Sequence, residues 1–155
     1  MRAHPKRRRH PQLDLDAQLC FPLYAATRAV TRAYADLLDD ASLTYPQYLT
    51  LLALWDAGRP VTVGELGGRL RLDSGTLTPL LKRLEAAGHV TRRRDTADER
   101  RVLVEVTESG WGLREQLSGV PRELFAGLGL DDDDAAELRR LLGHVVERLD
   151  LGRAD

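Results

Sequence analysis

The stretch that decides the fold runs from residue 61 to residue 107 and reads VTVGELGGRLRLDSGTLTPLLKRLEAAGHVTRRRDTADERRVLVEVT. Its pattern predicts a short helix over 63–70, a brief join and a longer helix over 73–87. Asp73 or Ser74 is placed to cap the longer helix, because a side-chain oxygen there can accept from a free backbone N–H of the first turn. Two helices joined by a short turn predict a helix-turn-helix.

The longer helix carries one apolar stripe at the spacing i, i+3, i+4 and i+7, formed by Leu77, Leu80, Leu81 and Leu84. This spacing predicts a single buried face. Polar side chains are left on other faces of the helix, among them Thr76, Lys82 and Arg83. The helix is therefore expected to pack through its leucines and to present polar groups outward.

A charged hairpin follows directly. Gly88 ends the helix, and residues 89–94 and 101–107 read as two strands around the polar loop 95–100. Helix, turn, helix and hairpin is the order of a winged helix-turn-helix. The fold class predicted is mainly α (α+β): a winged helix-turn-helix with a β-hairpin wing and N- and C-terminal dimerisation helices.

Helices are predicted on both sides of this unit. Residues 13–38 have an amphipathic period, with a kink or a late start expected near residue 21 because Pro22 lacks a backbone donor. Thr44 is a predicted N-cap for 44–55, and the acidic run 131–134 suits the start of a last helix to about 149. The predicted organisation is a flexible basic tail (1–12), an N-terminal dimerisation helix and sensor segment (13–43), a DNA-binding domain (44–108) and C-terminal dimerisation helices (109–155).

Composition limits the possible functions. A chain of 155 residues suits one domain, and no apolar run approaches the roughly 18 residues of a membrane span, so a cytoplasmic protein without membrane contact is expected. One cysteine excludes an intrachain disulfide and a zinc site built on paired cysteines, and the four histidines are scattered, so no metal or cofactor is predicted. The net charge is −1, but basic residues concentrate in segments 1–11 and 92–101.

That distribution favours a double-stranded DNA partner. A recognition helix offers short polar side chains to base edges while arginines bind phosphates. Arg100 is the predicted tip of the wing, since clustered arginines repel one another in a fold but suit phosphates or a narrow minor groove. The alternative without a DNA-binding role is that Ser74 is only an N-cap and that Lys82 and Arg83 only form a solvent-exposed face of the helix. The predicted contacts are Asp73, Ser74, Thr76, Thr78, Lys82, Arg83, Arg92, Arg94, Arg100 and Arg101.

Cys20 is the second informative residue. A free cysteine is more often a small core residue than a reactive one. Tyr24 and Tyr34, however, lie within about 40° of Cys20 on the helical wheel. Tyr34 is fourteen residues along, about 21 Å, so it cannot reach Cys20 of its own helix but could reach that of an antiparallel partner helix. This hints at a site built across a two-fold axis.

At these residues the sequence resembles the MarR winged-helix regulators, and among them the organic-hydroperoxide-sensing repressors called OhrR. The resemblance covers about residues 13–150. Its segments are LCFPLY at 19–24, LTYPQYL at 43–49, LDSGTLTPLLKR at 72–83 and DER at 98–100. It implies that Cys20 is the peroxide sensor, that Tyr34 and Tyr45 of the other subunit hydrogen-bond to it, and that Tyr24 supports the site.

The resemblance also implies a mechanism. A homodimer would bind a pseudo-palindromic operator as a repressor and release it when organic hydroperoxide oxidises Cys20 to a sulfenic acid, which a low-molecular-weight thiol then converts to a mixed disulfide. The chain departs from the family pattern at Pro22 and in its arginine-rich start. It also lacks the second, resolving cysteine of some members, so it resembles the one-cysteine type.

Two other functions are possible from the sequence. One keeps the fold but makes Cys20 inert packing, in a MarR-type repressor released by a small aromatic ligand. The other is a thiol peroxidase that uses Cys20 with turnover. Neither a thioredoxin-like alternation of strands and helices nor a resolving cysteine is found, so an enzyme is not predicted.

Overall fold

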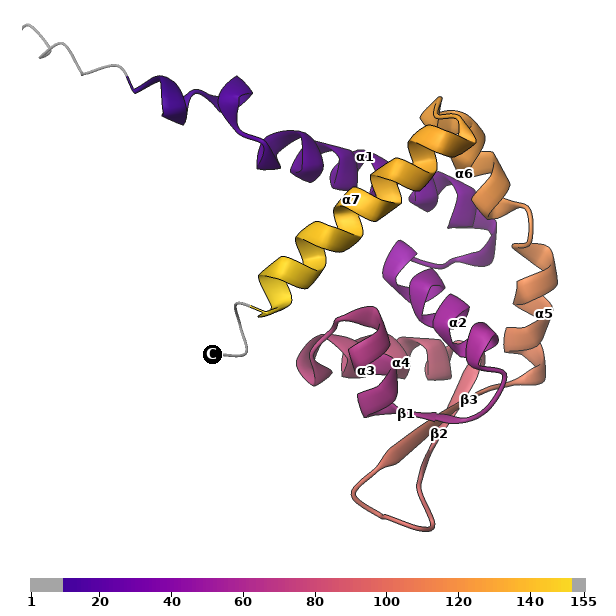
Figure 1. The fold of residues 1–155 in the computed structure, drawn as a ribbon. Helices are drawn as coiled ribbons and strands as arrows, with labels where there is room; N and C mark the ends of the chain where they lie inside the picture. Colours follow the sequence, from indigo (N-terminus) through magenta and orange to yellow (C-terminus); the bar gives the residue numbers. More distant parts are fainter. Residues whose placement is uncertain (1–9, 152–155) are drawn as a thin grey trace, which may run out of the picture. The chain divides into compact units, whose positions relative to one another are not determined.

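The computed structural model describes residues 10–151 (Figure 1). Within that range the helices are α1 (Cys20–Leu38), α2 (Tyr45–Ala57), α3 (Val63–Leu70), α4 (Ser74–Ala86), α5 (Glu108–Gln116), α6 (Val120–Leu128) and α7 (Asp132–Leu151), and the strands are β1 (Val61–Thr62), β2 (Val90–Arg94) and β3 (Val102–Val106). The chain divides into two compact units, and the division falls between Glu115 and Gln116. The first holds the winged helix-turn-helix, which confirms the mainly helical fold class.

The core of the first unit forms around α2, which is the most buried of its helices. Thr44 and Gln47 form a capping box at its start, where the Thr44 side chain accepts from the Gln47 N–H and the Gln47 side chain accepts from the Thr44 N–H. The predicted stripe of α4 is buried as a whole, with the exposed fraction of each leucine at 8% or less. The side chains shielded from water in this core include Tyr48, Leu51, Leu54, Leu66, Leu77, Leu81, Leu84, Val90 and Val104.

The wing is part of a three-stranded antiparallel sheet in the order β1-β3-β2. Val104 pairs with Val61 on one side and with Arg92 on the other. The hairpin of β2 and β3 was predicted, but β1 was missed, because two residues are too few to show the alternation that marks a strand. This strand fixes the wing to the start of α3, since β1 continues directly into that helix (Figure 1).

The N-terminal helix begins later than residue 13. Residues Pro11–Leu13 and Leu15–Ala17 form short 3₁₀ turns, and α1 starts at Cys20. Pro22 is therefore the third residue of α1, within the first turn, where a backbone N–H has no intrahelical partner to lose. Of the two expectations for Pro22, the late start is confirmed.

A close backbone contact fixes the base of the wing. The indole N–H of Trp55 donates to the Gly110 carbonyl oxygen at 3.0 Å, and the Thr107 hydroxyl donates to the Gly88 carbonyl oxygen at 2.6 Å. A Cβ atom at Gly110 would lie only 2.1 Å from the His89 carbonyl oxygen, so no larger residue fits there. The end of α4, the start of β2 and the start of α5 are thus held together on α2.

The second unit contains α6 and α7. The carboxylate of Asp131 accepts from the Asp134 N–H at 2.8 Å, and three aspartates occupy the first turn of α7, as its macrodipole favours. The predicted start near residue 131 is confirmed. The large apolar side chains that stay exposed on α7 are Leu138, Leu141, Val145 and Leu149.

Candidate DNA interface and sensor residues

The first turn of α4 shows which of the two predicted caps is used. The Asp73 carboxylate accepts from the Thr76 N–H at 2.8 Å, and this hydrogen bond holds the pKa of Asp73 below its usual range. Asp73 is therefore the cap, while Ser74 is the first helical residue and is exposed. With the cap supplied by Asp73, the Ser74 hydroxyl is available for another partner.

The outward face of α4 carries the predicted polar residues. Thr76, Lys82 and Arg83 are exposed, and Thr78 is half-buried. None of them belongs to the buried stripe, whose leucines face the core. The helix thus presents hydroxyls in its first turns and cations farther along, an arrangement suited to base edges and phosphates.

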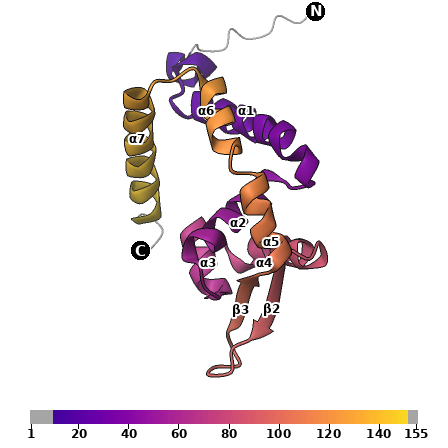
Figure 2. The same cartoon turned by 90° about the vertical axis from the view of Figure 1, so that its right-hand side faces the viewer.

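The wing loop is organised by its own polar groups. Arg94 donates to the Glu99 carbonyl oxygen at 2.8 Å, and the Asp98 carboxylate accepts from the Arg100 N–H at 3.1 Å. Arg100 and Arg101 are exposed, and the hairpin extends away from α3 and α4 (Figure 2). Arg94 therefore shapes the loop, and Arg100 and Arg101 remain the cations at its end.

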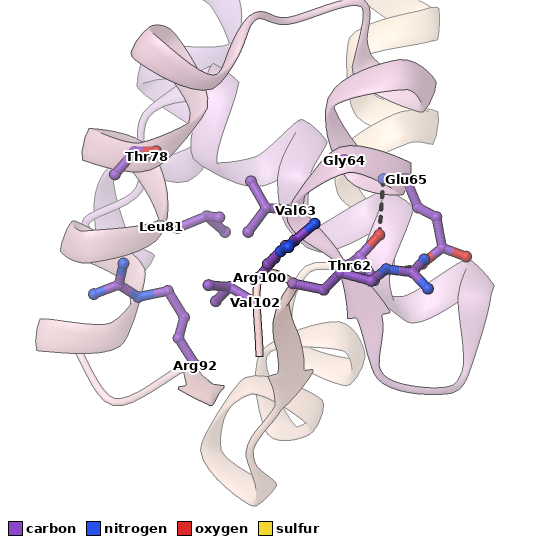
Figure 3. Close-up of a pocket in the computed structure, with 10 residues that line it drawn as sticks. Thr62, Val63, Gly64, Glu65, Thr78, Leu81, Arg92, Arg100 and Val102 are labelled. Carbon is purple, nitrogen blue, oxygen red and sulfur yellow. Dashed lines mark hydrogen bonds between the residues drawn. The ribbon is translucent and has the colours of Figure 1, made fainter. Parts of the chain in front are cut away.

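A pocket lies between α3, α4 and the wing, and it brings several predicted contacts together (Figure 3). It has a volume of about 600 Å³. Thr78 and Leu81 line it from α4, Arg100 from the wing loop, and Thr62 from the end of β1. The recognition helix and the wing tip thus border one concave space on the same side of the unit.

Arg92 lies differently from the other predicted contacts. Its guanidinium binds the Glu85 carboxylate, with Nε–Oε2 at 2.9 Å and Nη2–Oε2 at 2.5 Å, and its backbone N–H donates to Glu85 Oε1 at 3.1 Å. Glu85 belongs to the last turns of α4 and was not singled out from the sequence. Nothing in the local sequence around Glu85 indicated this role, because its ion pair with Arg92, seven residues later, depends on the tertiary fold.

Cys20 is exposed at the first residue of α1. Tyr24, the predicted supporting residue, is also exposed, and its hydroxyl accepts from Arg28 at 3.1 Å while the guanidinium lies 5.7 Å from the ring centre. Tyr24 is thus engaged with its own helix one turn further along.

Tyr34 and Tyr45 come together from α1 and α2. Their rings are stacked, with centroids 3.9 Å apart and planes 10° from parallel. Burial, together with the neighbouring Tyr45, raises the pKa of Tyr34 to about 12, and burial also raises the pKa of Tyr45. Both phenols keep their protons at neutral pH, and a side-chain hydrogen bond links the two hydroxyls. Tyr48 was not predicted from the sequence, and the centroid of its ring lies 5.7 Å from that of Tyr34.

Comparison with known proteins identifies the chain. A family model described as "Transcriptional regulator SarA/Rot" matches residues 32–117, more than half of the chain. The organic hydroperoxide resistance transcriptional regulator of Bacillus subtilis is 46% identical over 88% of this chain and 92% of its own length. The chain belongs to the MarR family, in its OhrR branch. The transcriptional regulator TtmR of Methylorubrum extorquens is 50% identical over 88% of this chain and 68% of its own.

A solved structure supports the same assignment for this MarR-family chain. Reduced AbfR bound to DNA, a protein of Staphylococcus epidermidis, superimposes with a TM-score of 0.71 at 34% identity and covers 90% of this chain and 96% of that one. The protein is thus a DNA-binding transcriptional regulator of the MarR/OhrR type, a family that does not consist of enzymes. Within residues 10–151, no helix has the length and apolar character that crossing a membrane requires.

Proposed function

We propose that this OhrR-type regulator is a repressor that leaves its operator when an organic hydroperoxide oxidises Cys20. The observation that carries the proposal is the stacked pair of protonated phenols, Tyr34 and Tyr45, at the opposite end of α1 from an exposed thiol. Such phenols are suited to stabilise a thiolate by hydrogen bonding. Cys20 and Tyr34 of one chain are about 21 Å apart along the helix, so the sensor needs two subunits.

A homodimer supplies that second subunit. Leu38 is the buried residue of α1, whereas apolar side chains such as Leu19, Phe21 and Leu23 are exposed on the chain taken alone. An apolar surface of this kind is typical of an interface. If α1 of two subunits pack antiparallel, Tyr34 and Tyr45 of each subunit approach Cys20 of the other. The exposed stripe of α7 is a second surface that a dimer would cover.

The chemistry needs a thiolate and an accessible peroxide. The Cys20 sulfur attacks the terminal oxygen of the hydroperoxide, a sulfur–oxygen bond forms, the oxygen–oxygen bond breaks, and the alkoxide takes a proton and leaves as the alcohol. Cys20 becomes a sulfenic acid. Because the chain has no second cysteine, a low-molecular-weight thiol then condenses with the sulfenic acid, and water is lost as a mixed disulfide forms.

Oxidation changes DNA binding through the dimer seam. The added thiol is bulky and lies where two copies of α1 meet, so the distance between the two copies of α4 changes. The half-sites of an operator are a fixed distance apart, and a dimer with altered spacing binds them less well. On the DNA side, Ser74, Thr76 and Thr78 read bases, while Lys82, Arg83, Arg100 and Arg101 bind phosphates or the minor groove.

The decisive experiment replaces the sensor. Cys20→Ser keeps the size of the side chain but has no thiolate to oxidise, so the variant should bind operator like the parent and stay bound when organic hydroperoxide is added. Operator binding is measured with and without peroxide in the presence of a small thiol, and mass spectrometry follows the adduct on Cys20. Release of Cys20→Ser by peroxide as readily as the parent would refute the proposal and favour the ligand-gated repressor.

A further inference from the structure

One ion pair connects the recognition helix to the wing. Glu85, near the end of α4, receives three hydrogen bonds from a single residue of β2: two from the Arg92 guanidinium and one from the Arg92 N–H. These bonds hold the pKa of Glu85 below its usual range. The side chains of Arg92 and Glu85 are 24% and 36% exposed, so water screens them less than a surface pair. The guanidinium binds Oε2 of Glu85 and the backbone N–H binds Oε1, so both carboxylate oxygens are held and the orientation of the pair is fixed as well as its distance.

We propose that Glu85 and Arg92 are positioning residues for DNA recognition, which set the angle of the wing against α4 and do not themselves touch DNA. The inference rests on the DNA contacts proposed above. Arg92 and Arg100 line the same pocket as Thr78 (Figure 3). The Glu85–Arg92 pair, here called the clamp, therefore lies beside the space between the wing tip and the recognition helix. Arg92 pairs with Val104 in the middle of the hairpin, and Arg100 precedes Val104 by four residues.

The geometry explains why a clamp is needed. β2 and β3 form a hairpin whose loop extends beyond α3 and α4 (Figure 1), and a hairpin on its own is only marginally stable in water. DNA binding requires α4 and the wing loop to meet neighbouring parts of the duplex at the same time. Fixing the hairpin before DNA arrives removes a conformational cost from binding.

Loss of the Glu85 charge and loss of its positioning role predict opposite changes in DNA affinity. Removing a carboxylate beside a DNA-binding surface should tighten binding, because a repulsion with phosphates is lost. The clamp predicts the opposite: Glu85→Ala weakens binding about tenfold, in the range of the coupling between contacting charged residues. Arg92→Ala should weaken binding by a similar factor without changing the salt dependence, since it removes no phosphate contact.

The experiment measures the affinity of the full-length protein at several salt concentrations for a duplex that the parent selects from a random pool. Arg100→Ala is the reference variant that removes a direct DNA contact, and it should reduce the slope of log affinity against log salt by about 0.9. In the Glu85→Ala background the loss caused by Arg100→Ala should shrink, because a wing that is free to move makes that contact less often. The swap of Glu85→Arg with Arg92→Glu should recover most of the affinity lost in either single variant.

Several results would overturn the inference. Tighter or unchanged binding by Glu85→Ala would do so, as would a salt slope for Arg92→Ala reduced as much as that for Arg100→Ala. Glu85→Gln keeps an oxygen acceptor for the Arg92 N–H, so it should fold and should lose less affinity than Glu85→Ala. If Arg100→Ala has no effect on binding, the proposed interface is wrong; if it has one but Glu85→Ala and Glu85→Gln do not, the clamp alone is wrong.

Discussion

The ring of Tyr34 stacks on the ring of Tyr45, with centroids 3.9 Å apart and planes inclined by 10°. The two residues come from α1 and α2, so the loop between these helices presents both phenols as one unit. Burial raises the pKa of each above its usual value, so both hydroxyls are protonated at neutral pH. In the proposed dimer this pair faces the Cys20 thiolate of the other subunit.

Loss of either hydroxyl should therefore slow the response to peroxide. Tyr34→Phe and Tyr45→Phe keep the ring, so DNA binding should be unchanged. A hydrogen bond to a charged group is worth about 1.5–3 kcal/mol, which corresponds to a loss of about 10- to 100-fold in the rate of Cys20 oxidation. The rate is measured by stopped-flow or by thiol trapping. Tyr24→Phe, whose hydroxyl accepts from Arg28, is the control and should change the rate less.

Substitutions on α4 and on the wing should affect DNA binding in different ways. Arg100→Ala should weaken binding to all duplexes alike, because contacts to the backbone or the minor groove position the protein. Thr78→Ala and Ser74→Ala should instead change which sequences are preferred, by about 1–3 kcal/mol at the affected base pair. Selection from a random pool followed by sequencing distinguishes the two. Uniform losses for all three variants would contradict this division.

Two glycines of α5 should respond oppositely to the same change. Gly110→Ala places a Cβ 2.1 Å from the His89 carbonyl oxygen, a clash with backbone that should cost about 1–3 kcal/mol of unfolding free energy. Gly112 has nothing within 4 Å of its missing Cβ, so Gly112→Ala should stabilise by about 0.5–1 kcal/mol through helix propensity. Denaturant unfolding gives both values. A Gly110→Ala variant as stable as the parent would show that the contact at the wing base is loose.

The capping box of α3 should make stability depend on acid pH. The Thr62 N–H donates to the Glu65 carboxylate at 2.7 Å, and this bond, with help from Arg59, lowers the Glu65 pKa to about 2. Since the pKa is depressed on folding, the stabilisation is complete above about pH 4.5 and is lost as the pH falls through about 2.

Thermal unfolding between pH 6 and pH 2 tests this dependence. Glu65→Gln keeps the acceptor oxygen but has no charge, so the gap in melting temperature between parent and variant should narrow as the pH falls. Glu105→Gln, which removes an exposed carboxylate from β3, is the control for net charge. A gap that stays constant over this pH range would mean that Glu65 contributes through packing alone.

Two hypotheses about the ends of the chain stay predictions. Residues 1–9 of the basic tail lie outside the described residues. Its role in DNA binding is tested by deleting residues 2–11 and measuring how the affinity for DNA changes with salt concentration. The dimerisation helices are supported by the exposed apolar residues of α1 and of α7, each considered by itself. Sedimentation at micromolar concentration tests the homodimer, and a monomer with intact operator binding would refute it.

The sequence by itself determined what repeats locally along the chain. The leucine spacing of α4, the alternation of β3 and the Thr44 cap of α2 depend on side chains within about four residues of one another, so their pattern survives without the fold. The same local logic placed Cys20 and Tyr34 on one face of α1 and at opposite ends of it.

Only the tertiary structure decided which of these elements meet. The pairing of Glu85 with Arg92, the strand β1 and the stacking of Tyr34 on Tyr45 each join side chains from different elements. Such contacts depend on how helices pack and on the register of the sheet, and no spacing in the sequence encodes either. Arg92 shows the consequence: the charge pattern placed it among the DNA contacts, while the fold gives it a carboxylate partner because α4 and β2 run side by side.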